Sequence, residues 1–256
     1  MNREEAVLRE LNLYPLWRLR KGNGGDIGHP AAFPLCGQRD TVAPAAAQAV
    51  GIVEPKVETA SKSREQLISE LDWPDLKAMV RDCTACKLRA GCTQTVFGVG
   101  DEKADWLFVG EGPGADEDAQ GEPFVGQAGK LLDNMLAAIR LKRGNNVYIA
   151  NIVKCRPPGN RTPEPDEIAT CIPYLRRQTA LIQPKLIVAL GKTAANALLG
   201  KEATIGSLRG TLHDYHGIPL LVTYHPAYLL RSPMEKAKAW QDLCLAVDTM
   251  NATARD

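Results

Sequence analysis

From residue 104 onward, short apolar runs alternate with segments of helical periodicity. The apolar runs predict buried strands at Trp106–Val109, Val147–Val153, Leu186–Leu190 and Leu220–Tyr224. The periodic segments predict helices over Ala128–Leu141, Pro165–Gln183, Thr193–Leu199 and from about Met234 to Met250. Strands separated by helices imply a parallel sheet covered on both faces, so we expect an α/β fold.

The chain before this region divides into three parts. Residues 3–20 mix leucines with charges and are typical of a short amphipathic helix as far as Leu13. Residues 22–63 hold glycines, prolines and an alanine-rich stretch with little periodicity, which predicts a flexible linker. Helical spacing then runs from Leu67 to Val80, with Pro74 expected to break or kink it. We therefore expect a short helical segment over 1–21, the linker, and a folded domain over 64–251.

Composition and charge narrow the class of protein. The 256 residues are 45% hydrophobic, no apolar run is long enough to span a bilayer, and the N-terminus lacks an apolar signal core. We therefore expect a cytoplasmic protein that makes no membrane contact. The formal net charge of +1 does not indicate a nucleic-acid binder, so any DNA contact requires a local basic surface.

The loop after the first strand is rich in glycine. It reads GEGPGADEDAQGEPFVG over residues 110–126, and its first three glycines let the backbone approach a ligand closely. Gly110, Gly112 and Ala115 also match the dinucleotide fingerprint, but the acidic run 116–118 would repel a pyrophosphate. A nucleotide cofactor is therefore disfavoured.

Two further loops leave the carboxyl edge of the predicted sheet, where ligands of such sheets bind. Asn151 ends the second strand, and its amide offers a donor and an acceptor to the edge of a base. The following proline-stiffened loop carries Lys154, Arg156 and Arg161, which are either phosphate contacts or ordinary solvated charges. His225 lies just past the fourth strand, where a structural and a catalytic role are equally open.

Four of the seven cysteines form a candidate metal set. Cys83 and Cys86 are spaced by two residues, and Cys155 and Cys171 follow later in the chain. An odd number of cysteines in a cytoplasmic chain argues against a disulfide framework. Spacing alone leaves zinc, a [4Fe–4S] cluster and chance open, with Cys92 as a nearby fifth thiol.

Taken together, these segments resemble the family-four, iron–sulfur uracil-DNA glycosylases over roughly residues 75–235. The resemblance is carried by CTAC, GEGPGADEDAQGEPFVGQAGKLL, VYIANIVKCRPPGNRTP, the segment Cys171-Ile-Pro-Tyr-Leu, and YHPAYLLR. It implies a three-layer α/β/α sandwich with a central four-stranded parallel sheet. It also implies an enzyme of base excision repair, which flips uracil out of DNA and hydrolyses its N-glycosidic bond, leaving an abasic site. The cofactor implied is a [4Fe–4S] cluster held by Cys83, Cys86, Cys155 and Cys171.

The resemblance also assigns roles within the loops. Phe124 matches the residue that stacks on uracil, Asn151 the residue that reads its polar edge, and His225 the residue that stabilises its oxygen. Gly110 and Gly112 would contribute backbone amides. Gly112 stands where related families place a water-activating aspartate, so Glu111 and Glu117 are the candidate bases. We expect Glu117 to matter more for water activation, with Glu111 as the alternative base or a structural residue. The expected DNA contacts are Arg156, Arg161 and Arg231, with Leu229 as the wedge that fills the duplex.

The resemblance also implies a binding partner and an oligomeric state. The partner implied is uracil-containing DNA, single- or double-stranded, bound by a monomer. The alternative is a non-catalytic DNA-binding module that kept the fold and the cluster, although intact Phe124, Asn151 and His225 argue against it. Residues 10–14, ELNLY, resemble peptides that bind bacterial sliding clamps, and residues 1–21 loosely resemble a clamp-loader accessory peptide. This segment either docks on a replication protein or folds back on the core.

Overall fold

The structure is a computed structural model that describes residues 62–253. The expected docking segment 1–21 and nearly all of the expected linker lie outside the described residues. Between residues 62 and 253, no helix combines the length and the apolar character needed to cross a membrane.

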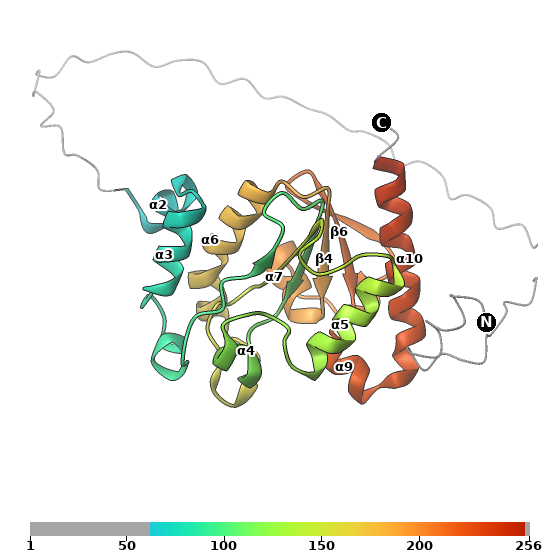
Figure 1. Cartoon of the computed structure of the whole chain (residues 1–256), viewed down its shortest axis with the longest axis horizontal. Helices are drawn as coiled ribbons and strands as arrows, with labels where there is room; N and C mark the ends of the chain where they lie inside the picture. The colour runs from blue at the N-terminus through green and yellow to red at the C-terminus, as the bar shows by residue number, and fades with distance from the viewer. Residues whose placement is uncertain (1–61, 254–256) are drawn as a thin grey trace, which may run out of the picture. The chain divides into compact units, whose positions relative to one another are not determined.

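A six-stranded sheet forms the middle layer (Figure 1). Its strands are β1 (Val99–Gly100), β2 (Trp106–Gly110), β3 (Val147–Asn151), β4 (Leu186–Leu190), β5 (Leu212–Tyr215) and β6 (Ile218–Thr223). They lie in the order β1-β3-β2-β4-β6-β5. The four central strands are parallel, which confirms the predicted core of the fold. The two edge strands pair antiparallel and were not expected, because β1 has two residues and β5 has a largely exposed pattern.

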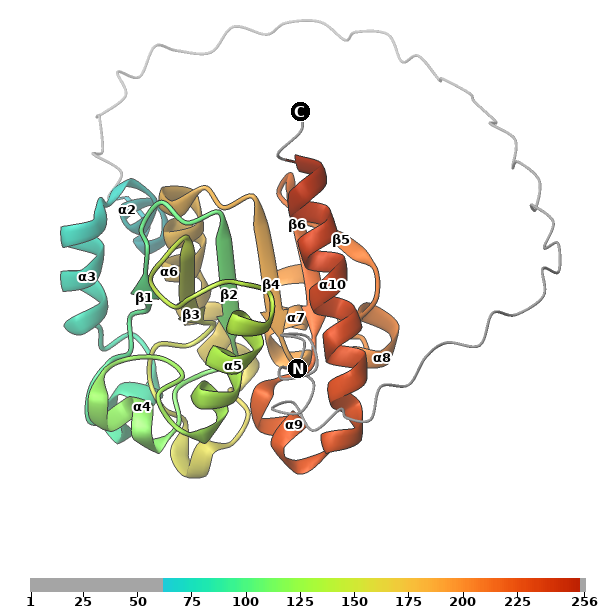
Figure 2. The same cartoon turned by 45° about the vertical axis from the view of Figure 1, so that its right-hand side comes forward.

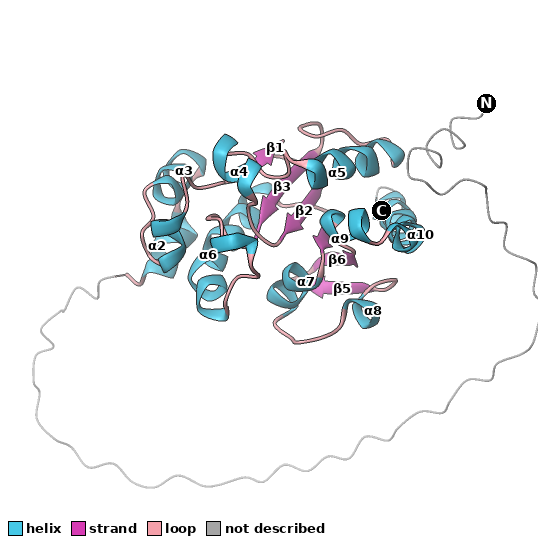
Figure 3. Cartoon of the chain, turned by 90° about the horizontal axis from the view of Figure 1, so that it is seen from below, coloured by secondary structure: helices cyan, strands magenta, loops and turns pink. Residues whose placement is uncertain are grey.

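Side chains that alternate along the strands build a core on each face of the sheet. Leu107 and Val109 of β2 pack toward the face covered by α2 (Arg64–Glu70), α3 (Trp73–Arg81), α6 (Pro165–Ile182) and α7 (Lys192–Leu199). Trp106 and Phe108 pack toward α5 (Gln127–Ala138) and α10 (Lys236–Thr253) on the opposite face. Figures 2 and 3 show the two helical layers, so the three-layer sandwich is confirmed.

The helical segment around Pro74 divides into two helices. Helix α2 ends before Leu71, and Asp72 caps α3 by accepting a hydrogen bond from the Asp75 amide at 3.2 Å. Pro74 then lies in the first turn of α3, where its missing N–H costs nothing. The expected break is therefore present, but it lies two residues earlier than the proline.

Short helices in the connections were not expected from the periodicity. They are η1 (Lys87–Gly91), α4 (Ala115–Gln120), η2 (Pro158–Asn160), α8 (Ile205–Leu208), α9 (Pro226–Arg231) and η3 (Pro233–Glu235). Elements of three to six residues are too short to show a helical repeat. Three of them, α4, η2 and α9, lie in the loops that surround the carboxyl edge of the sheet.

Candidate active site

A cavity of about 440 Å³ lies beyond the carboxyl ends of the parallel strands. Gly110, at the end of β2, and Asn151, at the end of β3, are register partners, so their loops begin side by side. The cavity is lined by eight of the residues predicted for the site: Glu111, Gly112, Glu117, Phe124, Asn151, Arg161, His225 and Arg231. Segments far apart in the sequence therefore converge at the edge that the topology predicts for ligands.

Asn151 presents a buried acceptor to this cavity. The side chain is 2% exposed, and among residues 62–253 no donor reaches its Oδ1 atom. A buried polar atom without a partner costs free energy unless a ligand or water supplies one. Gly110 makes room for this amide, since a Cβ there would lie 2.5 Å from Asn151 Oδ1 and from Phe124 Cζ. The site thus holds an acceptor positioned for a donor on a ligand.

Phe124 forms an aromatic wall beside the amide. Its φ of 57° lies in the left-handed region, which is uncommon for a bulky residue. Arg143 holds this turn by donating from Nη1 to the Pro123 oxygen at 2.8 Å and from Nη2 to the Phe124 oxygen at 2.7 Å. The Phe124 ring lies 5.5 Å from the His225 ring, between centroids. Arg143 is a residue that sequence reasoning missed, because it lies outside every motif.

His225 enters the cavity as the residue that precedes α9. Its Nδ1 accepts a hydrogen bond from the Ala227 amide at 3.1 Å, which places the ring proton on Nε2 and makes Nε2 a donor. Burial, and then the nearby charge of Arg231, lower the pKa of His225 to about 4. The imidazole is therefore neutral at physiological pH and presents one N–H to the cavity.

The two candidate carboxylates differ in their surroundings. Glu117 Oε1 accepts hydrogen bonds from the amides of Val125 and Gly126 at 2.9 and 3.0 Å, and Oε2 accepts from the Gly114 amide at 3.0 Å. Glu117 therefore ties the glycine loop to the turn that carries Phe124. Glu111 lines the same cavity, and its main-chain oxygen accepts a hydrogen bond from Val153.

Two residues expected at the DNA surface are buried instead. Leu229 is 1% exposed and packs among Leu131, Met135 and Leu243, so it is wrong as the duplex wedge. Lys154 is 1% exposed, and its Nζ donates to the main-chain oxygen of Asn151 at 3.0 Å and to Gln178 Oε1 at 2.6 Å. It is therefore neither of the two alternatives that the sequence left open, a phosphate contact or a solvated charge. Sequence showed the charge and the apolar type of these residues, but not the direction in which their side chains point.

The remaining arginines lie at the cavity or beside it. Arg231 is exposed on α9 and lines the cavity. Arg156 donates from Nε to Asn160 Oδ1 at 2.7 Å in the loop after β3. Arg161 lines the cavity, but it also forms two hydrogen bonds to the buried carboxylate of Glu167. Exposed apolar residues in this part of the chain are Tyr228, which lines the cavity, Leu230 on α9 and Met234 on η3.

The four predicted metal ligands line one small internal cavity. Cys83 and Cys86 precede η1, Cys155 follows β3, and Cys171 lies on α6. Burial, together with the neighbouring thiols, raises the pKa of Cys171 to about 11, although the Lys154 charge opposes this shift. Within the described residues, no group of three ligating side chains is arranged to hold a single metal ion. A [4Fe–4S] cluster takes one thiolate on each iron, and the four thiols that line this cavity would supply such a donor set.

Cys92 is a fifth thiol that lies next to this set, in contact with Cys155. Its Sγ donates to the Arg89 oxygen at 3.6 Å and accepts from Arg89 Nη1 at 3.7 Å. It lies beside Cys155 but does not line the cavity that the other four thiols share.

The fold and this cleft define a class of protein. Residues 97–244 match the family model of the uracil DNA glycosylase superfamily. Similar proteins are the type-4 uracil-DNA glycosylases of Thermotoga maritima, at 47% identity over 60% of this chain and 80% of that protein, and of Archaeoglobus fulgidus, at 44% identity over 62% and 83%. A third, from Pyrobaculum aerophilum, is 40% identical over 68% of this chain and 93% of that protein. The chain belongs to this superfamily and, within it, to the type-4 uracil-DNA glycosylase family.

Proposed function

We propose that this protein removes uracil from DNA by hydrolysing the N-glycosidic bond, which leaves an abasic site for base excision repair. The observation that carries the proposal is the buried Asn151 Oδ1, which has no donor within residues 62–253 and lies in a cavity walled by Phe124 and His225. Uracil has an N3–H donor between two carbonyl acceptors. An amide acceptor at the base of an aromatic-walled cavity is complementary to that edge.

Bond cleavage places negative charge on the departing uracil and positive charge on the sugar. The Nε2–H of a neutral His225 donates to a uracil carbonyl oxygen, and this hydrogen bond strengthens as the negative charge develops. Phe124 stacks on the flipped base and helps to exclude water from its face. Because water is the nucleophile that attacks the sugar, the proposed reaction forms no covalent bond between protein and substrate.

We assign different roles to Glu111 and Glu117, the two candidate carboxylates of the loop after β2. The sequence favoured Glu117 as the base, but both of its oxygens accept hydrogen bonds from backbone amides. We therefore assign Glu117 the role of holding the loop that carries Phe124. Glu111 is the carboxylate that we assign to orient the attacking water. The backbone of Gly110 and Gly112 forms the floor of the site beside it.

The cysteine set is proposed to hold a [4Fe–4S] cluster. When bound, the cluster would cross-link the segment after α3 to the end of β3 and to α6. Arg64 Nη2 lies 3.9 Å from Cys83 Sγ, and the Lys154 amide donates to Cys171 Sγ at 3.3 Å, so donors already face the thiols. Anaerobically purified protein is expected to contain about four irons and to absorb broadly near about 400 nm. Stoichiometric zinc without iron would contradict the assignment.

Uracil-containing DNA, single- or double-stranded, is the proposed partner. We assign phosphate contacts to Arg156 and Arg231. We assign the duplex-filling role to Leu230 and Met234 in place of Leu229, because these two residues are 44% and 86% exposed on α9 and η3, which follow His225 in the chain. We propose that the protein acts as a monomer in the cytoplasm. We also propose that residues 1–21 dock on a replication clamp or clamp loader.

The decisive experiment is incubation of the protein with an oligonucleotide that contains one uracil, followed by alkaline cleavage. Strand cleavage at the uracil is expected for the wild type. Asn151→Ala and His225→Ala are expected to lower the single-turnover rate about a hundredfold or more while DNA binding survives. Binding without cleavage by the wild type would instead identify a non-catalytic DNA-binding module.

A further inference from the structure

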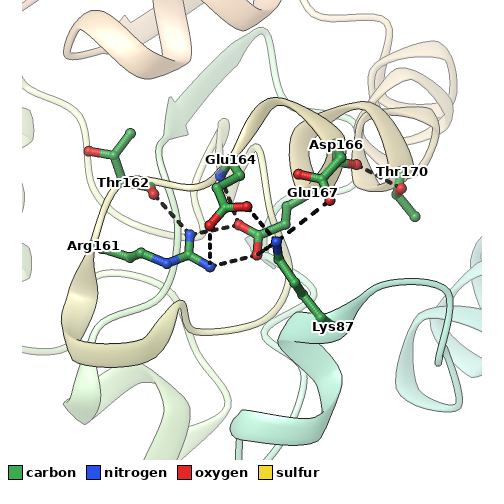
Figure 4. A network of polar contacts seen from close by, with 7 residues as sticks. All are labelled: Lys87, Arg161, Thr162, Glu164, Asp166, Glu167 and Thr170. Atoms are coloured by element: carbon green, nitrogen blue, oxygen red, sulfur yellow. Dashed lines mark hydrogen bonds and ion pairs between the residues drawn. The ribbon is translucent and has the colours of Figure 1, made fainter.

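Glu167 is a fully buried carboxylate at the start of α6, outside the residues assigned to catalysis. Its side chain is completely buried, and both oxygens accept hydrogen bonds from Arg161, Oε2 from Nη1 at 2.8 Å and Oε1 from Nη2 at 2.7 Å. Oε2 also accepts from the Glu164 amide at 2.8 Å, which closes the first turn of the helix. We call this bidentate pair of Arg161 and Glu167 the fork. Figure 4 shows it at the centre of a polar network.

The partner of Glu167 forms part of the substrate cleft. Asn160, Arg161 and Thr162 line the cavity between the loops after β2 and β3. Arg161 Nη1 also donates to the Thr162 oxygen at 3.1 Å, so one guanidinium fixes both its own side chain and the adjacent backbone. A planar bidentate pair permits one orientation of this fork, whereas a single charge would leave it free to rotate.

A second cation supports the same carboxylates. Lys87 Nζ contacts Glu164 and lies 3.8 Å from Glu167 Oε1 and 3.7 Å from Asp166 Oδ2. The hydrogen bonds from Arg161 hold the pKa of Glu167 below its usual range, although burial opposes this shift. The carboxylate therefore stays ionised and bonded, which a buried charge requires.

We propose that Glu167 is a positioning residue of the uracil site, which acts through Arg161 to hold residues 157–162 as one wall of the cleft. This inference rests on the proposed uracil excision. It assigns Arg161 a role different from a phosphate contact, since its two terminal nitrogens are directed at Glu167. Loss of the fork displaces the wall and misplaces the flipped base, and a displacement of about 1 Å is enough to slow a reaction severely.

The test compares Arg161→Lys with Arg161→Met and Glu167→Gln. Arg161→Lys keeps the charge but removes the fork, so all three variants are expected to lower the single-turnover excision rate by about tenfold or more. The Glu167→Gln/Arg161→Met double variant is expected to be no slower than either single variant, because both remove one interaction. Asp166→Asn is the matched control: it removes one exposed carboxylate from the same helical turn without a contact to Arg161, and it should retain the wild-type rate.

Salt dependence separates positioning from phosphate binding. The slope of log binding constant against log salt concentration, measured on uracil-free DNA, is expected to stay at the wild-type value in Arg161→Met. Loss of one phosphate contact would reduce that slope by about one. Such a reduction, or a wild-type rate in Arg161→Lys, would overturn the proposal.

Measurements of melting temperature and of hydrogen–deuterium exchange distinguish the proposed positioning role from a purely stabilising one. Variants with a lower melting temperature but a wild-type rate at 25 °C would overturn the proposal. Faster deuterium uptake confined to residues 157–162 in Glu167→Gln and Arg161→Lys would support it. If the wild type released no uracil, the proposed function would fail, while this exchange measurement would still decide whether the fork holds the loop.

Discussion

The guanidinium of Arg143 donates a hydrogen bond of 2.7 Å to the main-chain oxygen of Phe124 and fixes a left-handed turn at the aromatic wall of the cleft. Arg143 lies in the connection between α5 and β3, outside the glycine loop. The conformation of Phe124 is therefore held by a residue that does not line the cavity.

Replacing Arg143 by methionine is expected to release this turn. The two hydrogen bonds to the main-chain oxygens of Pro123 and Phe124 are lost, together with the exposed ion pair to Asp133. The single-turnover excision rate should fall about tenfold, because Phe124 no longer holds its stacking position. Arg140→Met, an identical change at an exposed position nearby, is the control. A wild-type rate in Arg143→Met would show that the turn is stable without the guanidinium.

His225 predicts a dependence of stability on pH. Its pKa is about 4 in the folded protein and about 6.5 in the unfolded chain. The unfolded chain therefore binds a proton first as pH falls, and the free energy of unfolding decreases between about pH 6.5 and 4, by up to about 3 kcal/mol from this residue. Urea unfolding of wild type and His225→Gln at pH 7 and pH 4 measures the effect: the variant should lose less stability. Parallel losses in both proteins would refute the low pKa.

Glu117 is expected to affect the reaction through loop geometry. Glu117→Gln places an N–H₂ group against at least one backbone donor, so the single-turnover rate should fall and deuterium uptake at residues 124–126 should rise. Glu111→Gln should instead lower the rate about a hundredfold or more without a change in deuterium uptake, because the attacking water loses its carboxylate. A larger loss of rate in Glu117→Gln, with unchanged uptake at residues 124–126, would reverse the two assignments.

Alanine substitutions at Leu229 and Met234 are expected to have different effects: the first on stability, the second on excision from duplex DNA. Leu229→Ala should destabilise the protein by about 3 kcal/mol, since it leaves a cavity among Leu131, Met135 and Leu243. Met234→Ala should leave stability unchanged and slow excision from duplex DNA more than from single strands. Equal rates of Met234→Ala and wild type on duplex DNA would exclude this side chain as a wedge.

Deletion of residues 1–21 tests the docking proposal for that segment. The truncated enzyme should excise uracil from a free oligonucleotide at the wild-type rate, because the described domain contains every residue assigned to the site. Binding to a purified sliding clamp, or to the clamp loader, should be lost. An insoluble or inactive truncated enzyme would mean that the segment packs on the core.

The central strands could be predicted because each is a continuous apolar run buried on both faces. Leu186–Leu190 has the bounds expected from the sequence, and Trp106–Val109 is one residue short. The edge strand β5 could not be found this way, because its residues are mostly exposed and mixed in polarity. Sequence patterns detect burial, and edge strands are only partly buried.

The cleft shows the same division between residue type and side-chain direction. Glycine and asparagine at the ends of β2 and β3 marked the site, since parallel strands bring their carboxyl ends together. Lys154 and Leu229 were misassigned because a loop sequence does not show which side chains turn inward. Arg143 and Glu167 were missed because their contacts, to Phe124 and Arg161, depend on loop conformations that no short motif encodes.

The short edge strands of the sheet limit intermolecular strand addition at high protein concentration. β1 contributes two residues and β5 contributes four, and both run antiparallel to their neighbours. An exposed edge strand offers its unpaired amides and carbonyls to any other extended chain, and a longer edge offers more of them. Because these edge strands are short, the sheet of residues 62–253 offers few free amides and carbonyls for strand addition by another molecule, and little template for fibrous aggregation.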